Sequence, residues 1–90
     1  MKSQEIAVIR WIDCAMHGNE QVSREDAEQS KLIYCVSSGL LIKEDKHRVV
    51  LAMDWFCEND SFREIHTYPK SGIIEIKKYK VKGFANDIWI

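Results

Sequence analysis

The sequence predicts a mainly β protein with one short helix, folded as a small antiparallel barrel or a strongly bent sheet of about five strands. Three observations support this prediction. Runs rich in β-branched and aromatic residues recur along the chain, short polar segments separate them, and a glycine interrupts the longest run. The 90 residues fit one domain, and a chain with 46% hydrophobic and 30% charged residues is expected to fold.

The first predicted strand covers residues 5–13, where apolar side chains occupy both odd and even positions. We therefore expect it to be central in the sheet and covered on both faces. After a break at residues 17–19, Ser23 and the acidic residues that follow it predict the start of a helix, with Ser23 as its N-cap. The helix is too short for a core element, and we expect it to form a lid on one end of the barrel.

The longest β-prone run spans residues 31–43 and contains Ser37-Ser38-Gly39 in its middle. Glycine inside such a run marks a bulge, a bend or a tight turn, so the segment forms either one bent strand or two strands. The polar residues 44–47 predict a turn, and residues 48–56 resume the β pattern. We expect these two β segments to form a hairpin.

The remaining strands are predicted at residues 62–68 and 73–79, with a turn at 58–61 before them. Pro69 ends the first of these two strands because proline cannot donate to a ladder and restricts the preceding residue. We expect residues 1–90 to form a single domain, with the barrel at about residues 5–79. The tail at residues 80–90 is too apolar for a solvated end, and we expect it to dock on the barrel or on another subunit.

The charge balance disfavours general DNA binding, because the net charge is −1 and non-specific affinity requires several cations on phosphates. The second half of the chain is nevertheless the more basic, with 8 basic and 6 acidic residues in 46–90. No apolar run is long enough to cross a membrane and the N-terminus does not resemble a secretory signal, so we expect a cytoplasmic protein. Cys14, Cys35 and Cys57 fit neither a disulfide framework nor a zinc site, and we interpret them as reduced apolar side chains.

Four short motifs occur in order along the chain. They are RWIDCA at 10–15, SGLLIKED at 38–45, VVLA at 49–52 and YPKSGIIEI at 68–76. Together they resemble small uncharacterised proteins of bacteria, prophages and phages that share a W-x-D-A, G-x-L-x-x-E-D, V-L-A and P-K-x-x-I pattern. The resemblance covers roughly residues 6–79, and it implies an SH3-like or Sm-like barrel of phage or mobile-element origin. It implies no particular activity and no catalytic residues.

Residues that could carry catalysis or bind a metal are few. Cys14 and His17 lie three residues apart, and such a pair can activate a thiolate, but no orienting group is evident nearby. The three histidines, His17, His47 and His66, lack the closely paired spacing of zinc ligands. We therefore expect no enzyme activity, no metal and no cofactor, and we rank a thiol or metal enzyme last.

The best candidate for a binding site is the basic run near the C-terminus, which contains Lys77, Lys78, Tyr79, Lys80 and Lys82. In an extended strand, Lys78, Lys80 and Lys82 share one face and could attract a nucleotide or an RNA backbone. Stacking would come from Tyr79 or from Trp55. The alternative, which we favour, is an edge strand whose lysines oppose aggregation.

The three tryptophans are expected to differ in role. Trp11 lies in the most apolar strand and is expected in the core, whereas Trp55 is expected to be half-exposed. The apolar residues of the tail, which could pack on the barrel or form an oligomer contact, are Phe84, Ile88, Trp89 and Ile90.

Two functions follow from these observations. The first is a non-catalytic, phage-type binding module that engages, and in doing so could neutralise, a host macromolecule such as a protein. The second is an oligomeric barrel that binds a small nucleotide or single-stranded RNA through the face at Lys77–Lys82. In both cases we expect a homo-oligomer without membrane contact.

Overall fold

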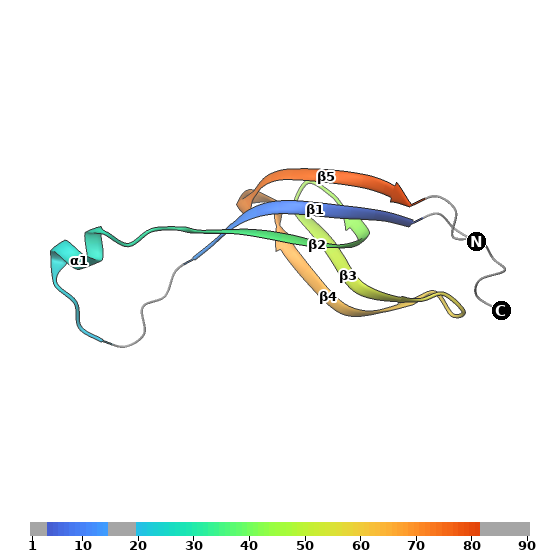
Figure 1. Cartoon of the computed structure of the whole chain (residues 1–90), viewed down its shortest axis with the longest axis horizontal. Helices are drawn as coiled ribbons and strands as arrows, with labels where there is room; N and C mark the ends of the chain where they lie inside the picture. Colours follow the sequence, from blue (N-terminus) through green and yellow to red (C-terminus); the bar gives the residue numbers. More distant parts are fainter. Residues whose placement is uncertain (1–3, 15–19, 82–90) are drawn as a thin grey trace.

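The computed structural model describes residues 4–14 and 20–81, and it confirms the prediction of a mainly β fold with one short helix (Figure 1). Five antiparallel strands form one sheet. Their bounds, with those of the helix and a 3₁₀ turn, are β1 Gln4–Asp13, α1 Arg24–Glu28, β2 Ile33–Glu44, β3 Arg48–Phe56, β4 Ser61–Pro69, η1 Lys70–Gly72 and β5 Ile73–Val81.

The strand order is β4-β3-β2-β1-β5, so β4 and β5 lie at opposite ends of the sheet although they follow each other in sequence. Only the three residues of η1 join them. The sheet must therefore bend until its two outer strands approach each other at this end (Figure 1). Because β4 and β5 do not pair, the barrel is not closed. Of the two predicted alternatives, a closed barrel and a bent sheet, the structure is the bent sheet.

The core lies on the concave side of the bent sheet. The buried members of its central cluster are Ala7 and Ile9 of β1 and Val49 and Leu51 of β3, and Ala52 of β3 is buried as well. Trp11 packs against this cluster with its ring edge-on to Tyr68, at a centroid distance of 5.1 Å. The core thus takes alternate residues along β1, which are Ala7, Ile9 and Trp11, and along β3, which are Val49 and Leu51, as expected for a sheet with one buried face.

The expectation that β1 is covered on both faces is wrong. Ala7, Ile9 and Trp11 belong to the core, whereas on the other face Arg10 is exposed and Ile6 and Val8 are only partly buried. The physical reason is that the sheet is a single bent layer. Among the described residues no second layer covers the side of β1 that faces away from the core.

Gly39 allows β2 to run as one bent strand, which decides between the two alternatives left open by the sequence. A Cβ atom on Gly39 would lie 2.9 Å from the carbonyl oxygen of Ala52 and 3.2 Å from Cβ of Leu51. The glycine therefore permits close approach of β3 at the point where β2 changes partners. Residues 33–40 of β2 pair with β1, whereas pairing with β3 extends only from Leu40 to Glu44.

Beyond this point, β1 and β2 continue without β3 as an arm, which we define as residues 8–13 and 33–38, and β5 accompanies β1 only as far as Trp11 (Figure 1). The helix α1 lies at its far end. The arm makes the molecule elongated, with extents of 61 × 23 × 19 Å and a radius of gyration of 18.0 Å. A compact chain of this length would have a radius of gyration of about 12 Å.

The helix does not form a lid, and that expectation is wrong. All of its residues are exposed, and it lies away from the sheet (Figure 1). Its five residues offer no apolar stripe that could be buried against another element. The N-cap prediction is confirmed, because Oγ of Ser23 accepts a hydrogen bond from the amide of Asp26 at 3.1 Å.

The predicted turns are confirmed. Residues 45–47 join β2 to β3, residues 57–60 join β3 to β4, and η1 follows directly after Pro69. In the first turn, Oδ1 of Asp45 accepts hydrogen bonds from the amides of His47 and Arg48, at 2.8 and 2.9 Å. Both bonds lower the pKa of Asp45, and the bond from the amide of His47 has the larger effect.

Candidate binding surface

The basic run lies on β5, and the predicted alternation of its side chains is confirmed for the described residues. Lys77 and Tyr79 oppose Val8 and Ile6 of β1, on the side of the sheet away from the core. Lys78 and Lys80 lie on the other side, and Lys82 lies outside the described residues.

Lys78 forms an ion pair. Its Nζ atom lies 2.7 Å from Oε1 of Glu44, whose Oε2 atom is 2.8 Å from Nζ of Lys70. The hydrogen bond to the Glu44 carboxylate raises the pKa of Lys78. The ammonium groups of Lys70 and Lys78 lower the pKa of Glu44, and that of Lys70 has the larger effect. Because Glu44 neutralises Lys78, this lysine adds little to the attraction of a phosphate.

Trp55 is not brought to the basic run. It lies on β3, which β2 and β1 separate from β5 in the sheet order. Its Nε1 atom donates to Oδ1 of Asp60 at 2.9 Å, and its ring stacks on that of Phe62 at a centroid distance of 6.3 Å. Trp55 is half-exposed, as expected, but it stabilises the β3–β4 hairpin instead of forming a stacking surface with Tyr79.

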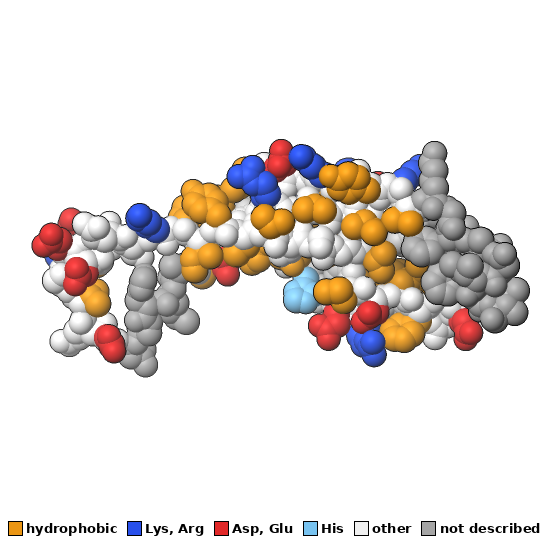
Figure 2. Space-filling model, viewed as in Figure 1, with side chains coloured by type: hydrophobic (Ala, Val, Ile, Leu, Met, Phe, Trp, Pro, Cys, Tyr) orange, Lys and Arg blue, Asp and Glu red, His pale blue; other side chains and the backbone are white. Residues whose placement is uncertain are grey.

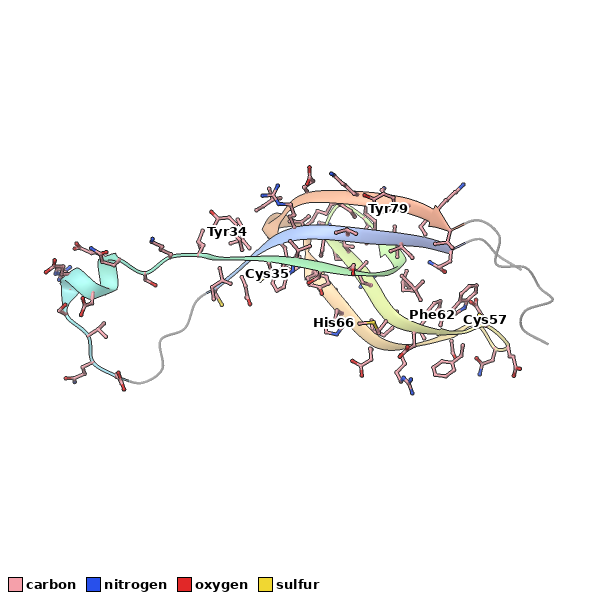
Figure 3. The ribbon with its side chains drawn as sticks, viewed as in Figure 1. Tyr34, Cys35, Cys57, Phe62, His66 and Tyr79 are labelled. Atoms are coloured by element: carbon pink, nitrogen blue, oxygen red, sulfur yellow. The ribbon has the colours of Figure 1, made fainter. Side chains whose placement is uncertain are left out.

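The sequence did not indicate the apolar surface that covers the side of β1, β2 and β5 away from the core. We call this surface the outer face. Its apolar members, which the strand register places on one side, are Ile6, Val8, Ile12, Tyr34, Val36 and Tyr79. Figure 2 shows hydrophobic side chains in a row over these three strands, and Figure 3 places Tyr34 and Tyr79 toward its two ends.

Three members of the outer face are strongly exposed: Tyr34 at 68%, Val36 at 69% and Tyr79 at 53%. Charged groups lie among them. Arg10 forms an ion pair with Glu75 at 3.7 Å, and Lys77 is exposed on the same side. The sequence could have indicated this surface, since apolar residues occupy the even positions of β1 and β2 as well as the odd ones.

A cleft of about 310 Å³ opens where β2 leaves β3, between the arm and the β3–β4 hairpin. Its lining includes Ser37, Leu51, Met53, Glu64, His66 and Tyr68. His66 and Tyr68 are stacked at a centroid distance of 6.3 Å, and Oγ of Ser37 accepts a hydrogen bond from Nε1 of Trp11 at 2.9 Å. The cleft could not be predicted from local sequence, because three strands and a change of pairing partner create it.

The cysteines and histidines do not form a site in the described part of the chain. Cys14 is exposed, Cys35 and Cys57 are partly buried, and His17 lies outside the described residues. No group of three potential metal-binding side chains occurs among residues 4–14 and 20–81. The expected oligomer contacts, Phe84, Ile88, Trp89 and Ile90, also lie outside the described residues.

Comparisons of this chain with protein families, with curated proteins and with solved structures found no match. None of the helices in the described ranges is long and apolar enough to span a membrane. The features from which a function can be inferred are therefore those of the molecule itself: a bent β-sheet, a projecting arm, a cleft at its base and an apolar outer face.

Proposed function

We propose that this protein is a non-catalytic binding module that engages another protein through its outer face. The phage-type resemblance of the four motifs suggests the setting, in which the partner is a protein of the bacterial host and binding in the host cytoplasm neutralises it. The observation that carries the proposal is the exposure of Tyr34, Val36 and Tyr79 on one side of three neighbouring strands.

The composition of the outer face supports a protein partner. Exposed apolar patches rimmed by polar groups mark interaction sites, and aromatic side chains contribute strongly to binding energy at protein interfaces. Here two tyrosines flank aliphatic residues of β1 and β2. The charges on this side include Arg10, Glu75 and Lys77, in which positive charge is in excess, and this complements a partner whose apolar patch has an acidic rim.

The test is capture of a partner from a nuclease-treated bacterial lysate by the immobilised full chain. A second chain carries Tyr34→Ser and Tyr79→Ser. The matched control carries Ile65→Ser, because Ile65 is 51% exposed but lies on β4, at the far end of the sheet from β5. We expect the same stoichiometric protein with the native chain and the control, and at least a tenfold loss with the tyrosine variant.

Two results would contradict this proposal. One is capture that the tyrosine substitutions leave unchanged while the variant keeps its far-UV spectrum. The other is capture that requires intact nucleic acid, since a protein bound directly to the outer face should remain after nuclease treatment.

A second candidate is a single-stranded RNA or a nucleotide, favoured by Lys77 and Tyr79, which are both exposed on one side of β5. A base could stack on the tyrosine while the ammonium group contacts a phosphate. Fluorescence anisotropy with labelled oligouridine tests it. Binding that weakens with salt and at least tenfold with Lys77→Glu would favour this candidate, and no binding at low salt would eliminate it.

A further inference from the structure

Within residues 4–14 and 20–81, no strand pairs with residues 33–39 of β2 on the side that faces away from β1. Pairing with β3 begins at Leu40, and no other described strand lies on this side. The segment Ile33-Tyr34-Cys35-Val36-Ser37-Ser38-Gly39 contains no charged residue and no proline. Natural proteins usually protect such an edge with charges, proline or a covering element, because it can pair with another strand. We call this segment the free edge.

We propose that the free edge pairs with the free edge of a second copy of this chain, in antiparallel orientation about a two-fold axis at Cys35. An antiparallel pair of identical strands satisfies the two-fold symmetry of a homodimer. The uncharged sequence makes self-pairing electrostatically permissible, since no like charges oppose each other. This proposal shares Tyr34 and Val36 with the function proposed above, but its tests measure association of the chain with itself and not capture of a host protein.

The position of the axis follows from the side chains that it brings together. With Cys35 on the axis, Tyr34 opposes Val36 of the partner subunit, and the symmetry repeats this pair. Aromatic and β-branched residues opposite each other stabilise antiparallel strands. In the isolated chain these two side chains are 68% and 69% exposed, so the pairing removes apolar surface from water in both copies.

The cleft at the base of the arm is complementary to this pairing. The same register sets the partner subunit's Ile33 opposite Ser37, and directly opposed residues lie on one side of a sheet. Ser37 lines the cleft together with Leu51 and Tyr68. Its volume of about 310 Å³ equals that of roughly ten water molecules, which leaves room for an aliphatic side chain. Ile33, which is 45% exposed in the single chain, would enter it and occupy part of it.

Site-specific oxidation tests the pairing. A chain with Cys14→Ser and Cys57→Ser retains Cys35 as its single cysteine. Opposed residues in antiparallel strands have Cα atoms about 4.5–5.5 Å apart, within the range that a disulfide spans. Diamide accepts the two electrons and two protons that two thiols release on forming the bond. We expect a covalent dimer within minutes, and light scattering of the unoxidised native chain should give twice its 10.5 kDa mass.

The matched control is a chain that retains only Cys57, through Cys14→Ser and Cys35→Ser. Cys57 is partly buried like Cys35, but it lies at the β3–β4 hairpin, away from the arm (Figure 3). At the same chain and diamide concentrations we expect less than a tenth of the covalent dimer. Equal crosslinking of the two chains would indicate random collision and would overturn the proposal.

A charge exchange tests the register. A chain with Tyr34→Lys and Val36→Lys places lysine opposite lysine in both symmetric pairs. We expect the dissociation constant of its dimer to rise at least tenfold. Tyr34→Glu with Val36→Lys opposes glutamate to lysine in both pairs and should restore association. A native chain that stays monomeric at millimolar concentration, or a dimer that both double variants leave equally stable, would overturn the proposal.

Discussion

The ammonium group of Lys70 donates a hydrogen bond to Oε2 of Glu44 over 2.8 Å, and it also donates to the carbonyl oxygen of Asp45 over 3.3 Å. Lys78 contacts the other oxygen of the same carboxylate. Glu44 is the last residue of β2, Lys70 begins η1 and Lys78 lies in β5. One carboxylate thus connects three elements at the end where the sheet bends toward closure.

The substitution Glu44→Gln should reduce stability by about 1 kcal/mol at neutral pH, since it removes both charge pairs from a partly exposed site. The pKa of Glu44 is lowered in the folded chain, chiefly by Lys70 and then by Lys78. The contribution of the Glu44 carboxylate to stability is therefore fully present above the ordinary pKa of glutamate. It is lost as the pH falls through the lowered pKa of Glu44 in the folded chain. Urea unfolding of both chains at neutral and acidic pH measures this difference.

The glutamine variant should thus approach the native chain in stability under acid conditions. Glu20→Gln serves as the control, because Glu20 is exposed and outside the strands and helices. A difference between native and Glu44→Gln chains that does not change with pH would contradict the role of the carboxylate charge.

Gly39→Ala should destabilise the fold by about 1–3 kcal/mol, as is typical when a packed site receives an extra methyl group. The new Cβ would lie 2.9 Å from the backbone oxygen of Ala52, which cannot move aside as a flexible side chain could. Gly72→Ala is the control, since its nearest contact would be 3.4 Å from the oxygen of Ile12. Thermal unfolding compares the two variants, and equal melting temperatures would argue against close packing at Gly39.

Ser37→Ala should cost roughly 1 kcal/mol by leaving Nε1 of Trp11 without its acceptor in a partly buried position. Ser38→Ala should have a smaller effect, because Ser38 is exposed and its side chain points to the other side of β2. Urea unfolding followed by far-UV circular dichroism measures both. If the two alanine variants are equally stable, the indole hydrogen bond contributes no net stability.

Ser23→Ala should leave global unfolding unchanged within about 0.5 kcal/mol, although loss of an N-cap weakens a helix by about 1 kcal/mol. The helix α1 has no buried residue through which its loss could affect the sheet. Trypsin should instead cleave after Arg24 more rapidly in the variant, because the helix opens locally. A large fall in the urea midpoint would show that α1 is coupled to the core.

The strands could be predicted because their signals are local. Apolar runs, the polar turn at Asp45 and the break at Pro69 each depend on a few neighbouring residues, and the structure has strands and turns at these places. Ser23 could be identified for the same reason, since a cap acts within one helical turn. The position of α1 relative to the sheet was predicted wrongly, although its five residues lack the apolar stripe that a lid would bury against the sheet.

The candidate sites depended on information that no single segment contains. The alternation along β5 follows from the strand period, and it was predictable. The pairing of Lys78 with Glu44 joins residues 34 positions apart and requires the bend of the whole sheet. Likewise, the sequence at Ile33–Val36 resembles that of a buried strand, and only the departure of β3 at Gly39 leaves it exposed.

The change of partners along β2 gives its amides two different environments. Leu40 pairs with both β1 and β3, whereas Leu41, Lys43 and Glu44 pair with β3 alone, so beyond Leu40 the amides that point toward β3 should exchange slowly. From Ile33 to Gly39 every second amide points away from β1, toward solvent in a single chain. Slow deuterium uptake along this one strand should therefore shift, beyond the glycine, from the amides that face β1 to the amides that face β3.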